Sequence, residues 1–176
     1  MSEPVRTPWK GKYLEAKVHG RWEWAARTGG IDAVVILAIH DGAVLLVEQE
    51  RVPLGRRSLE LPAGLVGDED RSESPEATAR RELEEETGYR AETVESLGAF
   101  ASSPGMTSET FTLVRATGLT KVGEGGGEAS EKIIVHRVPL GEVAAFAEMR
   151  RADGCMMDAK LLLVLAANIV PTAVPE

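Results

Sequence analysis

The segment from Arg80 to Gly88, RRELEEETG, places four glutamates within five positions of a predicted helix. Glu82, Glu85 and Glu86 are three and four residues apart, so they share one face of that helix. Like charges at this spacing repel each other, and the C-terminal end of a helix disfavours added negative charge. A cluster of carboxylates without a nearby cysteine or histidine suits Mg²⁺ or Mn²⁺. The alternative is a solvated acidic face that pairs with the two arginines at the start of the segment.

The residues around this cluster form a longer pattern. They resemble the Nudix box, G-x5-E-x7-R-E-U-x-E-E-x-G-U, in which U is an aliphatic or bulky apolar residue. The matching positions are Gly67, Glu73, Arg81, Glu82, Leu83, Glu85, Glu86 and Gly88. Tyr89 fills the final position, where an aliphatic residue is more usual. A strand, a loop and a capped helix are predicted in the order that the box requires.

Two glycines are candidates for the first position of the box. Gly67 has the correct spacing, but in related proteins this glycine usually follows an alanine directly, as Gly64 does within LPAG. We favour Ala63-Gly64 as the structural equivalent, with a longer loop after it. The choice between Gly64 and Gly67 leaves open which backbone carbonyl would reach a metal ion.

The resemblance implies hydrolysis of a nucleoside diphosphate that is linked to another moiety. Arg81 would orient the glutamates through charge-assisted hydrogen bonds, with Glu73 as support. The implied cofactor is Mg²⁺, with Mn²⁺ as a second option, which would neutralise phosphate oxygens and lower the pKa of a bound water. The implied metal ligands are the Ala63 carbonyl, Glu82, Glu85 and Glu86.

Features outside the box resemble the ADP-ribose pyrophosphatase subgroup. Pro104 lies 16 residues after Gly88, near the subgroup's marker proline, although Pro-Gly is also a common turn pair. The run VEQERVPLGRRSLELPAG resembles a subgroup segment in which an arginine, here Arg51, contacts substrate phosphate. GRWEWAART resembles the segment that stacks a tryptophan on adenine, which would be Trp22, with Glu23 accepting from the base edge. Packing within a hairpin is the alternative for Trp22.

The glycine-rich stretch before KIIVHRVPL contains two further candidate residues, Glu128 and Glu131. The subgroup keeps a glutamate in this loop as the general base, and the match to E-x-I-x-V-H favours Glu131. Glycines would let the loop close over substrate. The alternative is an acidic hairpin tip without a role. We interpret His136 and Cys155 as structural.

Local patterns predict the elements that would position these residues. A hairpin is predicted from residues 13–19 and 21–28, and a second from 32–39 and 43–51 across the turn pair Asp41-Gly42. A short strand ends at Pro62, and a helix runs from a Ser74 cap to Gly88. Further strands are predicted near 92–101, 109–117 and 131–138, and helices over 139–151 and 157–168.

These elements predict an α/β fold with a mixed sheet between helical layers. The resemblance specifies it as a Nudix-type α/β/α sandwich, with an N-terminal β-hairpin extension over residues 1–30 and a catalytic domain over 31–176. Members of the subgroup are typically homodimers whose N-terminal strands complete the partner's substrate pocket. The resemblance therefore implies a homodimer.

Composition limits the classes of function. The net charge of −8 over 176 residues argues against nucleic-acid binding, which depends on clustered Lys and Arg. The longest apolar stretch, LLLVLAANIV, is shorter than the roughly 20 residues of a membrane span, and no signal-peptide pattern is present. A lone cysteine excludes an internal disulfide. We therefore expect a cytoplasmic protein that binds neither nucleic acid nor membrane.

The leading hypothesis is a Mg²⁺-dependent enzyme that hydrolyses ADP-ribose, or a similar nucleotide sugar, to AMP and ribose 5-phosphate. One alternative is a hydrolase of another nucleotide sugar such as GDP-mannose. A second is a non-catalytic sensor that binds a nucleotide on the same scaffold, although a binder does not need clustered repulsive carboxylates.

Overall fold

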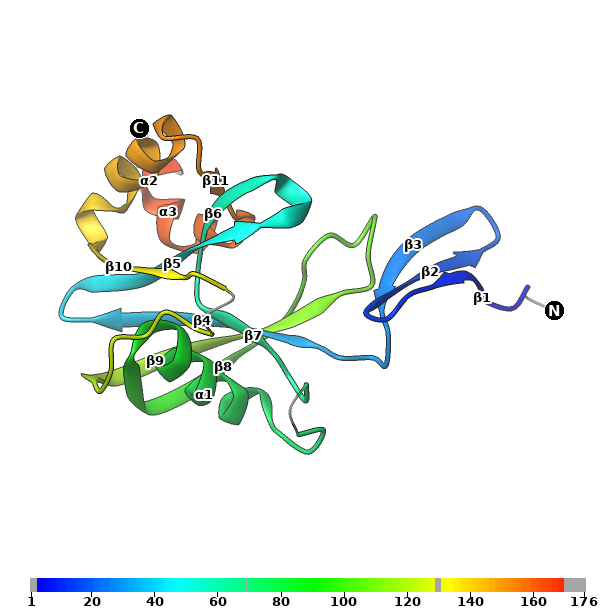
Figure 1. The fold of residues 1–176 in the computed structure, drawn as a ribbon, viewed down its shortest axis with the longest axis horizontal. Coiled ribbons are helices and arrows are strands. Elements are labelled where there is room, and N and C mark those ends of the chain that lie inside the picture. The colour runs from blue at the N-terminus through cyan, green and yellow to red at the C-terminus, as the bar shows by residue number, and fades with distance from the viewer. Residues whose placement is uncertain (1–2, 69, 129–130, 170–176) are drawn as a thin grey trace, which may run out of the picture.

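A computed structural model describes residues 3–68, 70–128 and 131–169. Its main body is a mixed sheet (Figure 1). The strands are β4 (Ala33–His40), β5 (Ala43–Arg51), β6 (Arg56–Glu60), β7 (Ala63–Leu65), β8 (Tyr89–Ala101), β9 (Thr110–Lys121), β10 (Ile134–Pro139) and β11 (Met156–Met157). They follow the order β11-β6-β5-β4-β9-β8, with β10 beside β5 and β7 beside β4. The pairs β4–β9 and β11–β6 are parallel and the others antiparallel, which makes the sheet mixed as predicted.

Helices cover both faces of this sheet. Helix α1 (Pro75–Thr87) packs Ala79 and Leu83 against one face, together with Val34 and Ile36 of β4. Helices α2 (Val143–Ala152) and α3 (Leu162–Ile169) pack against the other face, where Val35 of β4 is buried. Successive residues of a strand point to opposite faces, so β4 contributes to both cores. The predicted α/β/α layering is confirmed.

Local signals explain the boundaries that the sequence predicts best. The Ser74 hydroxyl accepts from the Ala77 amide at 3.2 Å at the start of α1, and Gly88 ends the helix with φ of 74°. The turn between β4 and β5 has positive φ at both Asp41 (45°) and Gly42 (69°), as a type I′ turn requires.

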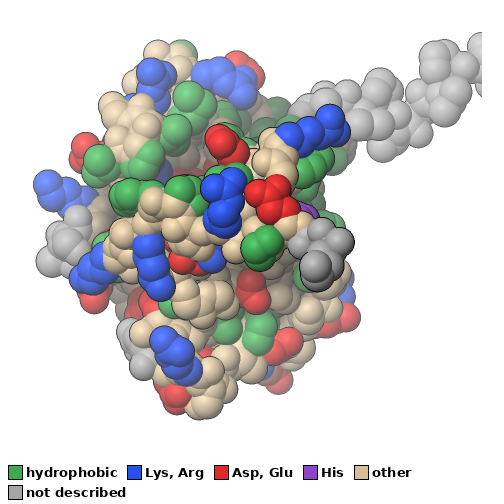
Figure 2. All heavy atoms as spheres, turned by 90° about the vertical axis from the view of Figure 1, so that its right-hand side faces the viewer, with side chains coloured by type: hydrophobic (Ala, Val, Ile, Leu, Met, Phe, Trp, Pro, Cys, Tyr) green, Lys and Arg blue, Asp and Glu red, His purple; other side chains and the backbone are tan. Residues whose placement is uncertain are grey.

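The N-terminal segment forms a separate three-stranded sheet of β1 (Arg6–Lys10), β2 (Leu14–His19) and β3 (Trp22–Arg27), beside the main body (Figure 1). The loop at 102–109 joins it to the body, because the Ala25 amide donates to the Met106 carbonyl at 3.0 Å. Hydrophobic, acidic and basic side chains are interspersed over this side of the molecule (Figure 2). The predicted extension is present, although β1 was not predicted. The division at residue 30 stays a prediction, and residues 170–176 of the second part lie outside the described residues.

Several predicted bounds differ from the structure. The strand predicted from residue 131 begins only at Ile134, because the preceding residues belong to a loop that docks on α1. The first C-terminal helix starts at Val143 after a 3-10 turn, η2 (Leu140–Glu142). The second starts at Leu162, after β11 and another 3-10 turn, η3 (Ala159–Leu161). In the described part of the chain, no helix combines the length and apolar character that a membrane crossing needs.

Candidate functional site

A cavity of about 880 Å³ lies between helix α1, the sheet and the segment around β11. Its volume falls in the range of small-molecule sites, roughly 300–1,000 Å³. Five of the predicted site residues line it, and they come from four separate parts of the chain: Arg51, Ala63, Glu82, Glu86 and Glu131.

Helix α1 presents Glu82 and Glu86 to the cavity. Glu86 is 5% exposed, and one of its carboxylate oxygens accepts from the Ala63 amide at 3.1 Å. Glu82 lies directly over Gly64, where an added Cβ would be 2.2 Å from the glutamate Cγ. Only a glycine leaves room for this side chain. Gly67 instead adopts φ of 82° in the loop before the helix, so Gly64 is the glycine that lies against the glutamates.

Both carboxylates hold protons more tightly than ordinary glutamates. Burial raises the pKa of Glu86 to about 8, with Glu82 and Glu131 adding to the rise and the Ala63 amide opposing it. Burial likewise raises the pKa of Glu82 to about 7 against the opposing charge of Arg81. Desolvation disfavours a negative charge unless a cation compensates it. The two side chains therefore form a site at which a bound cation would be favourable.

Arg81 forms ion pairs with several carboxylates beside this site. Its guanidinium lies 3.0 Å from Glu85, 3.1 Å from Glu82 and 3.5 Å from Glu73. Glu85 is half exposed and is held by this pairing instead of lining the cavity. Arg81 thus has the contacts expected of a residue that orients the glutamates, whereas Glu85 would have to rotate to reach an ion at Glu86.

The basic residues of the cavity are each held by an acidic one. Arg51 binds Glu60 through two bonds of 2.8 and 2.7 Å. Arg27 binds Glu109 at 2.6–2.7 Å, and Lys160 binds Asp158 at 2.8 Å. The acidic residues that line the cavity outside these three pairs are Asp68, Glu82, Glu86 and Glu131.

The loop between β9 and β10 brings Glu131 to the cavity. The amides of Gly126 and Gly127 donate to the carbonyls of Glu86 and Glu85 at 2.8 and 3.0 Å. These bonds satisfy carbonyls at the C-terminal end of α1, which the helix itself leaves open. The loop is therefore docked on the helix that carries Glu86. Glu128 donates its amide to the Glu131 carboxylate at 2.9 Å, and its own side chain does not line the cavity.

Three predicted substrate residues lie outside the cavity of their own chain. Trp22 is 60% exposed at the turn between β2 and β3. Glu23 lines a second, smaller hollow of about 400 Å³ on the N-terminal sheet. Pro104 is exposed in the loop that joins this sheet to the body.

Sequence reasoning missed other residues that line the cavity. They include Arg27, Gln49, Glu60, Glu109 and Phe111, and the segment 156–160. The sequence did offer a signal for Glu60, because it is the acidic residue of the predicted strand that leads into the box. Arg27 and Glu109 had none, because their pairing joins positions 82 apart in the chain.

The residues present fit a hard divalent cation. Carboxylate and backbone oxygens are the donors that Mg²⁺ prefers, and the buried Glu86 and the half-buried Glu82 both have raised pKa values. Across residues 3–68, 70–128 and 131–169, however, no three acidic, histidine or cysteine side chains already converge as a metal cage. Part of the ligand set would have to reorient on binding.

Comparisons with known proteins agree with this geometry. The model of the NUDIX domain matches residues 30–159. The chain is 38% identical to a methanol dehydrogenase activator of Bacillus methanolicus over 68% of this chain and 64% of that protein. It is 47% identical to an ADP-ribose pyrophosphatase of Bacillus subtilis over 44% and 40%. It is 34% identical to a GDP-mannose pyrophosphatase of Cronobacter sakazakii over 76% and 70%.

The matched region therefore spans less than two thirds of the first two of these relatives. Among solved structures, one described as an ADP compounds hydrolase superposes with a TM-score of 0.69 at 20% identity, covering 96% of this chain and 93% of that one. At that identity the likeness concerns the fold.

Proposed function

The chain belongs to the NUDIX family, and from this premise we propose that it hydrolyses the diphosphate bond of ADP-ribose or a similar nucleoside diphosphate sugar, giving AMP and ribose 5-phosphate. The observation that carries the proposal is the shared cavity of Glu82, Glu86, Arg51 and Glu131. The ADP-ribose pyrophosphatase among the relatives supports the choice of substrate.

The charge of the cavity supports a requirement for divalent cations. A diphosphate is anionic, and acidic side chains outnumber basic ones on the cavity wall. Bound Mg²⁺ or Mn²⁺ would supply positive charge at the phosphates and lower the pKa of a water molecule there. In this proposal Glu82, Glu86 and the Ala63 carbonyl hold such an ion, and Glu85 reaches it only by leaving Arg81.

The chain's own residues have separate roles in this proposal. Arg51 binds a phosphate oxygen from its position on the cavity wall, and Glu60 keeps its guanidinium in place. Glu131 accepts a proton from the attacking water, for which its place on the cavity wall is suited. Arg81 keeps Glu82 and Glu85 oriented.

The direct test is hydrolysis of ADP-ribose with and without Mg²⁺, with AMP measured by chromatography. We expect turnover that depends on the metal and is lost in the presence of EDTA. Absence of turnover with Mg²⁺ and with Mn²⁺ would refute the substrate assignment.

A second candidate substrate is GDP-mannose, because the pyrophosphatase that acts on it matches a larger share of this chain than the ADP-ribose enzyme does. Measuring kcat/KM for both nucleotide sugars decides between them. We expect ADP-ribose to be preferred, and a tenfold preference for GDP-mannose would reverse the assignment.

The exposed N-terminal sheet supports a homodimer. Large apolar side chains lie on its surface without cover in a single chain: Val5, Trp9, Tyr13, Leu14 and Trp22. Apolar surface of this kind commonly marks an interaction site. In the proposed dimer, Trp22 and Glu23 reach the partner's cavity, where an indole can stack on the base.

Complementation between two impaired variants tests this arrangement. A mixture of Trp22→Ala and Glu86→Gln chains contains heterodimers with one complete site, so we expect activity above that of either variant alone. A monomer in light scattering, or no recovery of activity after mixing, would contradict the shared site.

A further inference from the structure

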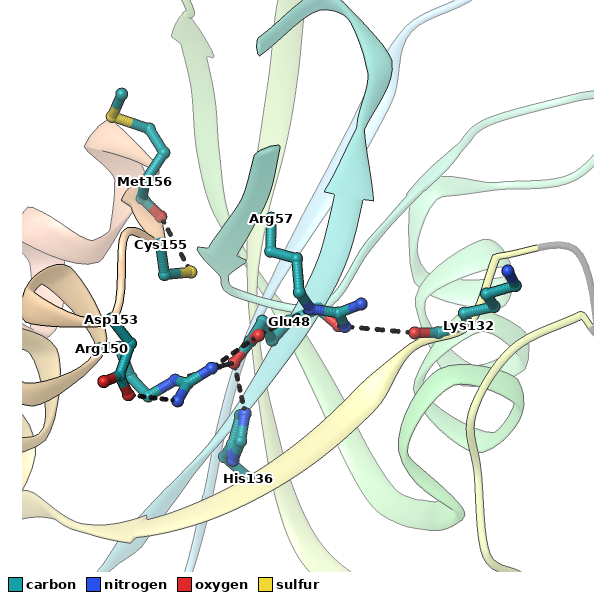
Figure 3. A network of polar contacts seen from close by, with 8 residues as sticks. All are labelled: Glu48, Arg57, Lys132, His136, Arg150, Asp153, Cys155 and Met156. Carbon is teal, nitrogen blue, oxygen red and sulfur yellow. Dashed lines mark hydrogen bonds and ion pairs between the residues drawn. The ribbon is translucent and has the colours of Figure 1, made fainter. Parts of the chain in front are cut away.

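A fully buried carboxylate lies behind the floor of the cavity. Glu48 of β5 is 0% exposed, and three cationic or titratable side chains converge on it from β6, β10 and α2 (Figure 3). Arg57 donates to it at 2.6 Å, Arg150 at 2.8 and 2.9 Å, and His136 lies 3.0 Å away. The neighbouring Gln49 lines the cavity, so Glu48 points to the opposite face of the sheet.

Arg57 connects this buried group to the loop that carries Glu131. Besides the Glu48 carboxylate, its guanidinium donates to the Glu48 carbonyl at 2.6 Å and to the Lys132 carbonyl at 3.2 Å. The ladder between β5 and β10 ends at the pair Glu48 and Ile134. The loop therefore joins the sheet at Ile134. Arg57 extends from β6 across β5 and binds the chain two residues before that point, at Lys132.

The backbone at Lys132 has an unusual conformation. Its φ of 52° makes it one of two non-glycine residues with positive φ in the described part of the chain. The other, Asp41, is explained by the hairpin turn between β4 and β5. Lys132 lies in no such turn and directly follows Glu131, and such backbone outliers concentrate at functional sites.

The same loop is fixed at its other end by α1. Gly126 and Gly127 donate to the last turn of that helix, and the Ile133 amide donates back to the Gly126 carbonyl at 3.3 Å. An added Cβ at Gly125 would lie 2.4 Å from the backbone of Thr87. This end of the loop is thus seated on the helix that carries Glu86, whereas Arg57 links the return of the loop, at Lys132, to β6.

We propose that Arg57, anchored on Glu48, is a positioning residue that holds Glu131 at the catalytic cavity through the Lys132 carbonyl. The inference rests on the proposed function for the meaning of Glu131. It adds a residue that lies outside the cavity and touches neither substrate nor metal.

Arg150 provides a matched control. It binds the same carboxylate as Arg57, and its other bond is to Asp153 instead of to any described residue of the loop. Arg57→Met and Arg150→Met each remove one cation from Glu48, so both should lower the melting temperature. We expect only Arg57→Met to lower kcat for ADP-ribose, by roughly 10–100-fold with KM within about threefold, because small misplacements of a catalytic group have costs of this size.

Arg57→Lys separates charge from reach and serves if the methionine variant does not fold. A lysine keeps a positive charge beside Glu48 but has no planar fork to join it to Lys132. We expect it to recover most of the stability and little of the kcat.

A double-mutant cycle distinguishes positioning from general weakening. If Arg57 acts through Glu131, adding Arg57→Met to Glu131→Gln should lower kcat by less than about twofold further. Independent, multiplying losses would overturn the proposal. So would wild-type kcat in both Arg57 variants when Glu131→Gln is impaired.

Hydrogen exchange tests the tether without turnover, which separates its failure from that of the proposed function. We expect the Ile133 amide, which follows the tethered Lys132, to exchange at least about tenfold faster in Arg57→Met than in Arg150→Met. Equal exchange in the two variants would overturn the tether even if the enzyme proves active. Faster exchange only in Arg57→Met would support it even if ADP-ribose is not the substrate.

Discussion

The protein buries a glutamate in each of two regions, and the pKa shifts of these two glutamates have opposite directions. Glu48 is fully enclosed, and burial would raise its pKa, but hydrogen bonds from Arg150, Arg57 and His136 outweigh this and hold the pKa below its ordinary value. Glu86 is almost as buried, and its pKa rises to about 8. The two carboxylates differ in the source of the positive charge that balances them. The fold supplies it to Glu48, whereas the site around Glu86 leaves it to be supplied from solution.

Removing the carboxylate at the second region should have the largest effect on activity. We expect Glu86→Gln to lower metal-dependent turnover by ~10²-fold or more, because it removes a ligand from the cation site. Stability without metal at pH 7 should stay equal or rise, since folding no longer has to protonate a buried carboxyl group whose pKa is raised to about 8. Glu84→Gln is the matched control. That residue is on the same helix and pairs with Arg90, and the variant should retain turnover within about twofold. Equal activity in both variants would contradict the role of Glu86.

The same substitution at the first region should act mainly on stability. Glu48→Gln leaves Arg57 and Arg150 facing a neutral amide, which we expect to lower the free energy of unfolding by about 3 kcal/mol. Glu95→Gln, which breaks the exposed pair with Arg115, should lower it by less than about 1 kcal/mol. Chemical denaturation measures both, and similar values would mean that the buried pairing is not special.

The two regions should give opposite slopes of stability against pH. The pKa of Glu86 is raised in the folded state, so without metal its stabilising contribution is full below pH 4.5 and is lost as the pH rises toward about 8, in total ~3–5 kcal/mol. The pKa of Glu48 is lowered, so its contribution is present above pH 4.5 and lost as the pH falls through the lowered value. Melting temperatures from pH 2 to 9 should show a flatter alkaline limb in Glu86→Gln and a flatter acid limb in Glu48→Gln. Curves parallel to wild type in both variants would break the comparison.

A smaller effect is expected from the glycine beneath Glu82. A Cβ at Gly64 would displace this side chain, so Gly64→Ala should lower turnover by roughly tenfold. Gly67→Ala places a side chain at φ of 82° and should lower stability by about 1 kcal/mol while activity changes little. Kinetics and melting of the pair test whether Gly64 is the glycine that serves the site, and a greater loss of turnover in Gly67→Ala would reverse the assignment.

The sequence predicts the elements that short-range chemistry determines. Ser74, Pro75 and Gly88 bound α1, and Asp41-Gly42 define a hairpin, because each acts within a few residues of itself. The spacing of Glu82 and Glu86 follows from the helical repeat in the same way. These signals are enough for the fold class and for the acidic half of the site.

What the sequence does not predict depends on distant partners. β10 starts later than predicted, at Ile134, because the loop before it docks on α1 through Gly126 and Gly127. The two residues of β11 form a strand only because β6 lies beside them. Glu48 reads as one more residue of a buried strand, and its partner Arg150 is 102 positions away. Residues whose role depends on a contact between distant parts of the chain can be identified only from the three-dimensional structure.

Titration calorimetry of Mg²⁺ or Mn²⁺ into the protein, with nucleotide present, tests the central claim most directly. The raised pKa values of Glu82 and Glu86 mean that a cation must displace protons at pH 7. We expect metal uptake with proton release, seen as a dependence of the heat on buffer ionisation, and loss of both in Glu86→Gln. No uptake by the wild-type protein, or unchanged uptake in the variant, would contradict the account.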